Sequence, residues 1–311
     1  MSLLRCSFHR LTHPSLPRFA LVFLNSGLVA PGLDAGGCNG THMNPPLYDA
    51  HNHLQDERFA PLRLEILEAA RRENVRKMVV NGSAESDWPG VERLAHEYPE
   101  VVPCFGLHPW YLKERSDGWQ KNLVACLDRC PGGIGEIGLD RWIEGHDLAD
   151  QSEVFAWQLR LAAERNLPVS VHCLQAWGRL LEILEAGPRP ACGFLLHSFG
   201  GPREMIGPFV ATGAYFSLPG YFAHERKLRQ RETFREVPPD RLLIETDAPD
   251  QPLPESQVRY PLQDHSGKAI NHPANLGAVY QFAADWFGEP VERLAFRMAE
   301  NFQRLFGGLL K

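Results

Sequence analysis

Two histidines spaced two residues apart are the first feature of this chain that could do chemistry. They stand in the segment Asp49-Ala50-His51-Asn52-His53, at the end of an apolar run that begins at Leu47. If that run is a strand, alternate side chains share a face, so the imidazoles of His51 and His53 converge. Two converging imidazoles can bind one metal ion. An isolated pair of this kind is equally typical of two exposed histidines in a turn, so the rest of the chain has to decide.

Residues able to bind metals recur at similar places along the chain. Each lies at or just beyond the carboxyl end of another apolar run; they are Glu136, His172, His197 and Asp247. Burying a single ionisable side chain is costly unless it is paired or bound to a metal, so this repetition favours one metal centre over coincidence. Nitrogen and oxygen donors suit Zn, Mn, Fe or a Mg-like ion rather than a thiolate-bound metal.

The set His51, His53, Glu136, His172, His197 and Asp247 is too large for one tetrahedral site with an open position. We therefore expect two divalent ions (Mg, Mn or Zn) that share the Glu136 carboxylate. One ion would be held by His51, His53 and Asp247, and the other by His172 and His197. Asp247 is the candidate general base, and together with Glu136 it forms the predicted catalytic pair.

The elements that must position these residues are short β-rich runs separated by longer segments of helical periodicity. The expected strands are 47–51, 77–81, 101–107, 133–137, 168–172, 193–197, 214–218 and 242–245. The expected helices are 62–72, 87–98, 119–130, 150–165, 176–184, 202–210 and 226–235, with two more at 274–287 and 291–306 after a proline-rich loop at 248–261. This alternation predicts βαβ units with a parallel sheet.

Eight such units match a single-domain α/β fold, the (β/α)8 TIM barrel with C-terminal helices, better than an open doubly wound sheet. In such a barrel the carboxyl ends of the strands form the floor of the active site, where the candidate ligands fall. The G-x-G-x-x-G and P-loop signatures of nucleotide-binding folds do not occur in the sequence.

Composition bounds the function of the 311-residue chain, which is 44% hydrophobic and 23% charged and therefore globular. A net charge of −6 argues against a protein that holds polyanions through its overall field. Residues 1–42 are rich in Pro and Gly, and their apolar run at 19–24 is too short to span a membrane. We expect a disordered extension or an upstream start there, with the barrel domain at 43–311. A lipoprotein-like signal ending at Cys38 is the alternative.

The seven cysteines lack any C-x-x-C pair, which predicts reduced thiols and a cytoplasmic protein.

Several segments together carry a resemblance to a known family. They are YDAHNHL (48–54), GLHPWY (106–111), GEIGLD (135–140), SVHC (170–173), LLHSFGG (195–201), ETDAP (245–249) and NHPANL (271–276). From about residue 47 the chain resembles the TatD family of metal-dependent hydrolases, a branch of the amidohydrolase-like barrels. The resemblance implies a divalent metal centre in a (β/α)8 barrel, with ligand roles for the six residues named above.

The resemblance also implies a deoxyribonuclease, of the kind that acts as a 3′ exonuclease in some members. It gives His108 a role in binding the substrate phosphate, whereas a histidine before a proline could simply cap a turn. The expected substrate is DNA, single-stranded or at 3′ ends, without a membrane or an obligate protein partner.

Two departures from the family pattern leave other functions open. The family commonly has Arg two residues after the strand-five histidine, but here His172 is followed by Cys173, Leu174 and Gln175. Its Arg-Asn-x-Pro motif is replaced by Ile270-Asn271-His272-Pro273. The alternatives are therefore a two-metal hydrolase of a lactone, amide or small phosphoester, and a non-catalytic metal-binding module.

Two further groups of side chains could contact a nucleic acid. Aromatic residues that could stack on bases, or simply pack over the barrel, are Trp110, Tyr111, Trp142, Tyr221 and Phe222. Basic residues that could form a phosphate track, or simply face solvent on helices, are Arg141, Arg203, Arg226, Lys227 and Arg229.

Overall fold

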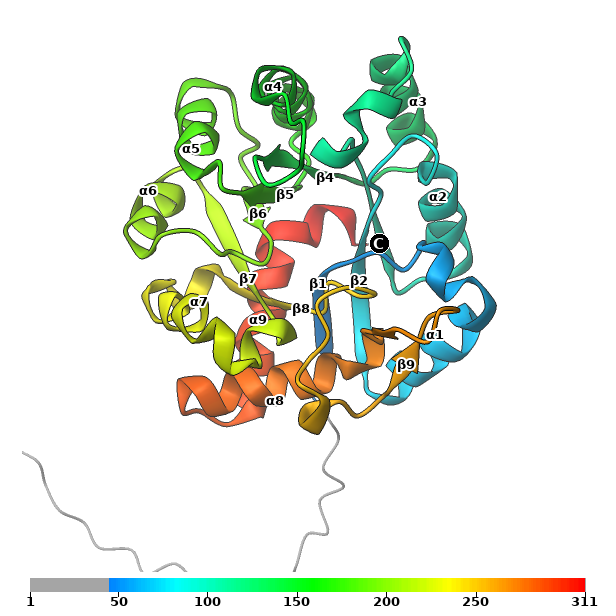
Figure 1. The fold of residues 1–311 in the computed structure, drawn as a ribbon, viewed down its shortest axis with the longest axis vertical. Helices are drawn as coiled ribbons and strands as arrows, with labels where there is room; N and C mark the ends of the chain where they lie inside the picture. Colours follow the sequence, from blue (N-terminus) through cyan, green and yellow to red (C-terminus); the bar gives the residue numbers. More distant parts are fainter. Residues whose placement is uncertain (1–44, 311) are drawn as a thin grey trace, which may run out of the picture. The chain divides into compact units, whose positions relative to one another are not determined.

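The computed structural model describes residues 45–310, and within that range eight parallel strands follow one another around a barrel surrounded by helices (Figure 1). The strands are β1 (Leu47–Asn52), β2 (Val75–Asn81), β3 (Val101–Phe105), β4 (Gly133–Asp140), β5 (Val169–Leu174), β6 (Phe194–Leu196), β7 (Ala214–Pro219) and β8 (Leu242–Glu245). Each pairs with its neighbour in chain order, so the predicted single-domain (β/α)8 barrel is confirmed. The expectation for residues 1–42 lies outside the described residues.

The helices also follow the predicted order. They are α1 (Arg63–Arg72), α2 (Trp88–Glu97), α3 (Trp119–Arg129), α4 (Leu148–Arg165), α5 (Trp177–Ala186), α6 (Ile206–Ala211), α7 (Leu228–Thr233), α8 (Leu276–Phe287) and α9 (Val291–Phe306). The longest, α4, begins where the Asp147 side chain accepts hydrogen bonds from the amides of Ala149 and Asp150. It ends at Asn166, whose left-handed backbone stops the helix. No described helix is long and apolar enough to cross a lipid bilayer.

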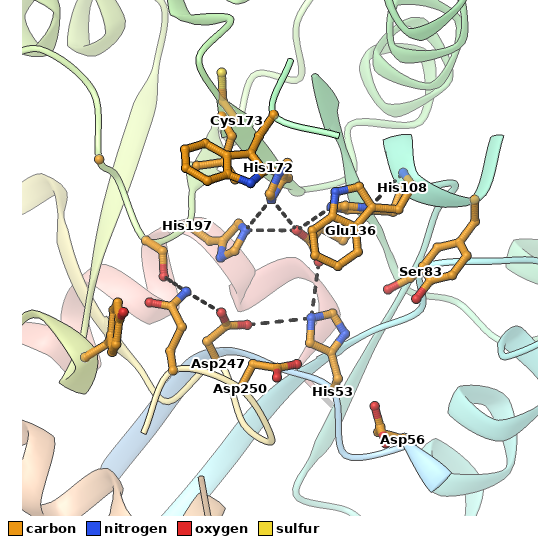
Figure 2. Close-up of a pocket in the computed structure, with 18 of the residues that line it drawn as sticks. His53, Asp56, Ser83, His108, Glu136, His172, Cys173, His197, Asp247 and Asp250 are labelled. Atoms are coloured by element: carbon orange, nitrogen blue, oxygen red, sulfur yellow. Dashed lines mark hydrogen bonds and ion pairs between the residues drawn. The ribbon is translucent and has the colours of Figure 1, made fainter. Parts of the chain in front are cut away.

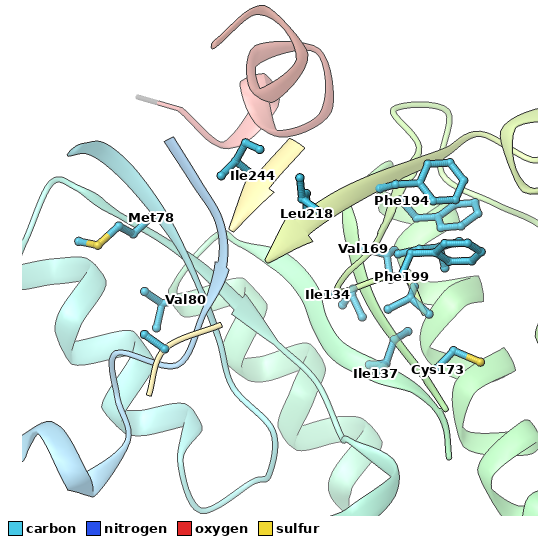
Figure 3. Packing of buried hydrophobic residues seen from close by; sticks show 14 of the residues in the cluster. Met78, Val80, Ile134, Ile137, Val169, Cys173, Phe194, Phe199, Leu218 and Ile244 are labelled. Carbon is cyan, nitrogen blue, oxygen red and sulfur yellow. The ribbon is translucent and has the colours of Figure 1, made fainter. Parts of the chain in front are cut away.

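Two layers of apolar side chains hold the barrel together. The outer layer lies between the strands and the helices, and Figure 3 shows part of it, including Ile134, Val169 and Phe194. The inner layer fills the barrel with residues such as Val79 and Leu195, and Phe302 and Phe306 of α9 pack onto it. Every residue of β3, β4, β6, β7 and β8 is buried, as expected for strands covered on both faces.

Helix α9 closes the amino-terminal end of the barrel. The Asn301 amide donates hydrogen bonds of 2.8 Å to the carbonyls of Pro239 and of Leu242, the first residue of β8. Since α9 occupies that end, ligands reach the barrel interior from the opposite, carboxyl end of the strands. That is the end where the candidate ligands were predicted to lie.

The seam between β8 and β1 is joined in an unusual way. The described residues show no β-ladder between these two strands, and the Asp49 carboxylate bridges them instead. It accepts hydrogen bonds from the Thr246 amide (2.9 Å) and the Thr246 hydroxyl (2.6 Å). Two backbone bonds add to it, from the His53 amide to the Ala248 carbonyl (2.8 Å) and from the Asp247 amide to the His51 carbonyl (2.9 Å). The seam thus places His51 and His53 beside Asp247.

Some local elements differ from the prediction. The segment expected as a helix at 226–235 is only a short α7 flanked by 3-10 turns at Glu225–Lys227 and Phe234–Glu236. The segment at 202–210 begins as a 3-10 turn at Arg203–Met205 before α6. After β8 a small hairpin, β9 (Leu262–Gln263) and β10 (Ala269–Ile270), was not predicted.

Candidate metal centre

Glu136 lies at the centre of the site, and its two carboxylate oxygens face different groups of histidines (Figure 2). Oε1 is 2.8 Å from His197 Nε2 and 3.2 Å from His172 Nδ1. Oε2 is 3.2 Å from His53 Nε2 and 3.5 Å from His51 Nε2. His51 of β1 and His53, one residue beyond it, therefore gather at one oxygen, and the histidines from β5 and from the end of β6 gather at the other; His51 and His53 are called the β1 histidines below.

Asp247 joins the group formed by the β1 histidines. Its Oδ1 lies 3.6 Å from His51 Nε2 and 3.7 Å from His53 Nε2. Its Oδ2 accepts a hydrogen bond from the Gln251 side chain, which fixes the direction of the carboxylate. The backbone of Asp247 is left-handed, with φ 53°, so the chain turns sharply just after β8 and brings the carboxylate over the barrel.

The structure thus brings all six predicted ligand residues together at one site. Three overlapping sets of donor atoms lie within 4.8 Å of one another: His51, Glu136 and His197; His51, His53 and Asp247; His108, Glu136 and His172. The sequence predicted Glu136 near the end of a strand at 133–137. In the structure it lies inside β4, which continues to Asp140. Two residues further along β4, a Cβ on Gly138 would lie 1.9 Å from the His172 carbonyl oxygen, so the close approach of β4 to β5 at this point requires glycine.

Hydrogen bonds on the far side of the rings orient two of the histidines. His53 Nδ1 lies 2.8 Å from the Asn81 carbonyl oxygen, and His172 Nε2 lies 3.1 Å from Asp140 Oδ2. A carbonyl or carboxylate can only accept, so the proton sits on that outer nitrogen in each ring. The inner nitrogen of each ring is therefore the one that would bind a metal ion, and the outer hydrogen bond fixes its direction.

The other two histidines have outer partners as well. His51 Nδ1 lies 2.7 Å from the Ser170 hydroxyl. His197 Nδ1 has no hydrogen-bond partner among the described residues, but it faces the fully buried Glu245 carboxylate at 3.8 Å. Glu245 in turn accepts hydrogen bonds from the Ser198 amide and hydroxyl and from Ser217. A carboxylate or hydroxyl behind a ligand histidine is the usual support of a metal site.

The pKa shifts follow from this crowding of buried groups. Burial lowers the pKa of His51 to about 4. Burial also lowers the pKa of His53, but the hydrogen bond and charge of Glu136 outweigh it and raise the value to about 9. Burial alone would raise the pKa of Glu136, yet the charge of His197 and the contacts with His108 and His172 hold it well below its usual value. Burial raises the pKa of Asp247 to about 7.

The donor set fits divalent metal ions. Imidazole nitrogens and carboxylate oxygens converge on a small buried volume, and their outer atoms are held by the rest of the protein. Converging lone pairs and carboxylates in a buried site are favourable only when a cation or protons compensate them. The residues present are therefore suited to bind such ions.

His108 caps a turn, which is one of the two interpretations that its sequence allowed, and it also faces the site. Its Nδ1 accepts the Trp110 amide hydrogen bond at 3.2 Å and so caps the 3-10 turn Pro109–Glu114. The proton must then lie on Nε2, which is 3.4 Å from Glu136 Oε1. Because burial lowers the pKa of His108 to about 4, the ring is neutral and presents a hydrogen-bond donor to the site rather than a ligand lone pair.

The site opens into a cleft of about 1580 Å³ at the carboxyl end of the barrel. All five aromatic residues that were predicted to contact a substrate line it, with Trp142 71% exposed and Phe222 buried. Arg203, Lys227 and Arg229 line the cleft as well, whereas Arg141 and Arg226 do not. Leu174 and Gln175, which follow the strand-five histidine, line it without adding charge, and Ile270 lies in β10.

Sequence reasoning missed the supporting residues Asn81, Asp140, Ser170, Glu245 and Gln251. Asp140 and Glu245 do fall inside motifs of the resemblance, GEIGLD and ETDAP. Nothing in the spacing of those motifs shows that each carboxylate stands behind a histidine of a neighbouring strand or loop. Only the arrangement of the strands places them there.

A parallel eight-stranded barrel with histidines and carboxylates at the carboxyl ends of its strands defines the class of barrel hydrolases. Comparison with known proteins agrees. The sequence model of the family described as TatD related DNase matches residues 48–307. The chain belongs to this TatD family.

Relatives and solved structures support the assignment. The chain is 33% identical over 267 residues to the "3'-5' ssDNA/RNA exonuclease TatD" of Escherichia fergusonii, covering 84% of this chain and 99% of that protein. The protein of the same name from Escherichia coli K12 is 32% identical, with the same coverage of both. The crystal structure of YJJV, a TatD homologue from Escherichia coli K12, superposes with a TM-score of 0.77 at 26% identity, covering 85% of this chain and 99% of that one.

Proposed function

We propose that this protein is a two-metal phosphodiesterase that removes nucleotides from the 3′ end of single-stranded nucleic acid, with DNA as the main substrate. The observation that carries the proposal is the division of the Glu136 carboxylate, whose two oxygens face two separate groups of histidines. A carboxylate so placed is suited to bridge two ions. The names of the relatives, "3'-5' ssDNA/RNA exonuclease TatD", support the choice of substrate and polarity.

His51, His53 and Asp247 would hold one ion and His172 and His197 the other, with Mg, Mn or Zn as the candidate metals. When bound, such a pair polarises the phosphoryl oxygen and lowers the pKa of water toward neutrality.

The chain's own residues provide proton transfer and orientation. Asp247 keeps Oδ1 toward the β1 histidines while Gln251 holds Oδ2. This carboxylate is our candidate for accepting the proton of the attacking water. His108 would donate its Nε2 proton to a non-bridging phosphate oxygen, since its Nδ1 already accepts the Trp110 amide.

A second candidate is a hydrolase of a small phosphoester, lactone or amide. The observation in its favour is that Leu174 and Gln175 line the cleft without supplying a cation where the family commonly has Arg.

The decisive experiment incubates the metal-loaded protein with single-stranded DNA labelled at its 5′ end, alongside a single-diester substrate and a lactone panel. A ladder that shortens from the 3′ end supports the first proposal. Cleavage confined to the lactones or small esters would replace it with the second. Binding of divalent ions without turnover of any substrate would leave only a metal-binding module.

The compartment we propose is the reducing cytoplasm. Cys104, Cys126 and Cys173 are buried free thiols, which is typical of proteins that carry no disulfides. Intact activity in a strong reductant is the expected result.

A further inference from the structure

The cleft is larger than one scissile diester requires. At about 1580 Å³ it exceeds the roughly 300 to 1,000 Å³ of sites that enclose a small molecule. Its lining extends from the loop after β1 to the loops after β7 and β8, so it crosses the whole mouth of the barrel. Glu136 and its histidines occupy only part of that lining. The remaining wall is available to parts of a substrate that are not being cleaved.

The cations on this wall differ in whether a carboxylate already neutralises them. Arg58 lies 2.8 Å from Asp56 and 2.9 Å from Asp250, and the three form a closed group at the rim. Arg203 pairs with Glu236. For Lys227 and Arg229, no ion pair is found in the part of the chain that the structure describes. These two side chains therefore retain their charge for a ligand.

Lys227 is held in place by aromatic rings rather than by a carboxylate. Its ammonium lies 4.9 Å from the centre of the Tyr221 ring and 5.9 Å from that of Phe222. Ring faces attract a cation without cancelling its charge. The side chain is half-buried, whereas Arg229 is exposed. Of these two cations, Lys227 is thus the one whose position is better defined.

The segment that carries the two rings is itself anchored. Buried Arg231 donates to the Ala223 carbonyl at 3.1 Å and lies with its guanidinium 4.6 Å from the centre of the Trp286 ring on α8. This contact fastens the turn after β7 to the helix layer. Because the turn is fixed, the position of Lys227 does not depend on a freely moving loop.

We propose that Lys227 binds a backbone phosphate of the substrate strand other than the scissile one, so that the cleft holds at least two phosphates of a single strand. This inference rests on the proposed function and adds to it a second anchoring point. In chain order β7 stands four strands from β3, so in the barrel the turn after β7 faces the side that carries His108 and Trp110 (Figure 1). The bound strand would therefore cross the candidate metal centre.

The test compares Lys227→Gln, Lys227→Arg and the wild-type protein on a ten-nucleotide thymidine strand and on bis(p-nitrophenyl) phosphate, which has one diester and no further phosphate. The quantity measured is kcat/KM as a function of KCl at constant divalent metal. Lys121→Gln is the matched control, because it removes the same charge from an exposed lysine of α3 that does not line the cleft.

Each phosphate contact to a single strand contributes about −0.7 to the slope of log(kcat/KM) against log[salt]. Lys227→Gln should therefore make this slope shallower by about 0.7. If the variant and the wild type have equal kcat/KM on the strand at 1 M KCl, the variant should then be about eightfold less active than the wild type at 50 mM KCl. Activity on bis(p-nitrophenyl) phosphate should not change. Lys227→Arg should restore the slope, and Lys121→Gln should behave as wild type.

The outcomes separate the inference from the function beneath it. If the wild-type protein degrades the strand and Lys227→Gln keeps the full salt slope, the role of Lys227 is overturned and the nuclease proposal stands. Equal losses on both substrates would also overturn it, because they indicate a structural role. If the wild-type protein degrades no strand at all, the proposed function has failed.

Discussion

Replacing Asp140 with asparagine should reverse the position of the proton on His172. Asp140 Oδ1 accepts hydrogen bonds from the amides of Trp142 (2.6 Å) and Ile143 (3.3 Å). Oδ2 accepts from Trp110 Nε1 (2.6 Å) and lies 3.1 Å from His172 Nε2. The two backbone amides cannot turn away, so an asparagine must keep its oxygen toward them and put its NH2 group in the place of Oδ2.

That NH2 group can only donate, so His172 has to accept at Nε2 and carry its proton on Nδ1. Nδ1 is the nitrogen that faces Glu136 Oε1 at 3.2 Å, and a protonated nitrogen cannot bind a metal. Burial would lower the pKa of His172, but its hydrogen bonds to Asp140 and Glu136 raise it above the usual value. The same pairing lowers the pKa of Asp140 to about 2 against the effect of burial, so Asp140 is ionised at neutral pH. The substitution therefore replaces a negatively charged acceptor with a neutral amide.

Changes to a group that orients a ligand typically cost 10- to 100-fold in metal affinity, and we expect a loss in that range for the ion held by His172 and His197. The lost Trp110 hydrogen bond adds only about 1 kcal/mol of destabilisation, because the indole is 53% exposed and water can replace its partner. The barrel should therefore stay folded while one metal site weakens.

The assay is calorimetric titration of the metal-free protein with Mn²⁺, together with activity as a function of Mn²⁺ concentration. Asp150→Asn is the matched control, since it removes a carboxylate paired with Arg115 at 2.7 Å on α4, away from the histidines. Asp140→Asn should shift one binding event and the activity curve to 10- to 100-fold higher metal, and Asp150→Asn should shift neither. Unchanged Mn²⁺ affinity in Asp140→Asn would refute the assigned proton position.

Four further outcomes follow from the same geometry. Glu136→Gln should lower activity by more than about 100-fold with an unchanged circular dichroism spectrum, because it removes the proposed shared ligand and not merely the support of a ligand; wild-type turnover would exclude the site. EDTA should inactivate the enzyme, and added divalent ion should restore it. Asp49→Asn should lower the free energy of unfolding by about 1 to 3 kcal/mol, roughly 2 to 12 °C in Tm by calorimetry, because the seam contact with Thr246 is lost. Trp142→Ala should raise KM for an oligonucleotide about 5-fold or more through lost stacking; Phe296→Ala, 67% exposed on α9, should not.

The strands of the barrel were predictable because both faces of each are covered. Continuous, largely apolar runs such as Phe194–Leu196 and Leu242–Glu245 are typical of buried β-strands. The hairpin of β9 and β10 was not predictable, since two residues per strand carry no periodic pattern. The short α7 was overestimated because 3-10 turns and α-helices share nearly the same spacing of apolar residues.

In the candidate site, the ligand residues could be predicted from the sequence, but the residues that support them could not. His51 and His53 could be placed from the two-residue period of a strand, and the ends of other strands indicated His172, His197 and Asp247. Those arguments concern one strand at a time. The group behind each histidine comes from another strand, as with Asp140 of β4 and His172 of β5, so its role depends on the register between elements. A single sequence contains no direct record of that register.

The net negative charge of the chain does not exclude a polyanionic substrate, because the charge near the site differs from that of the rest of the surface. Three arginines and one aspartate precede Met43, so the barrel domain carries an acidic excess of eight charges. At the site, however, Glu136 and Asp247 are surrounded by four histidines, and two bound divalent ions would make this region locally positive. Lys227 adds a cation at the cleft wall that no described carboxylate neutralises. A polyanion would then be attracted to the mouth of the barrel and repelled by the rest of the surface, which favours a short bound segment and a strand end over long duplex DNA.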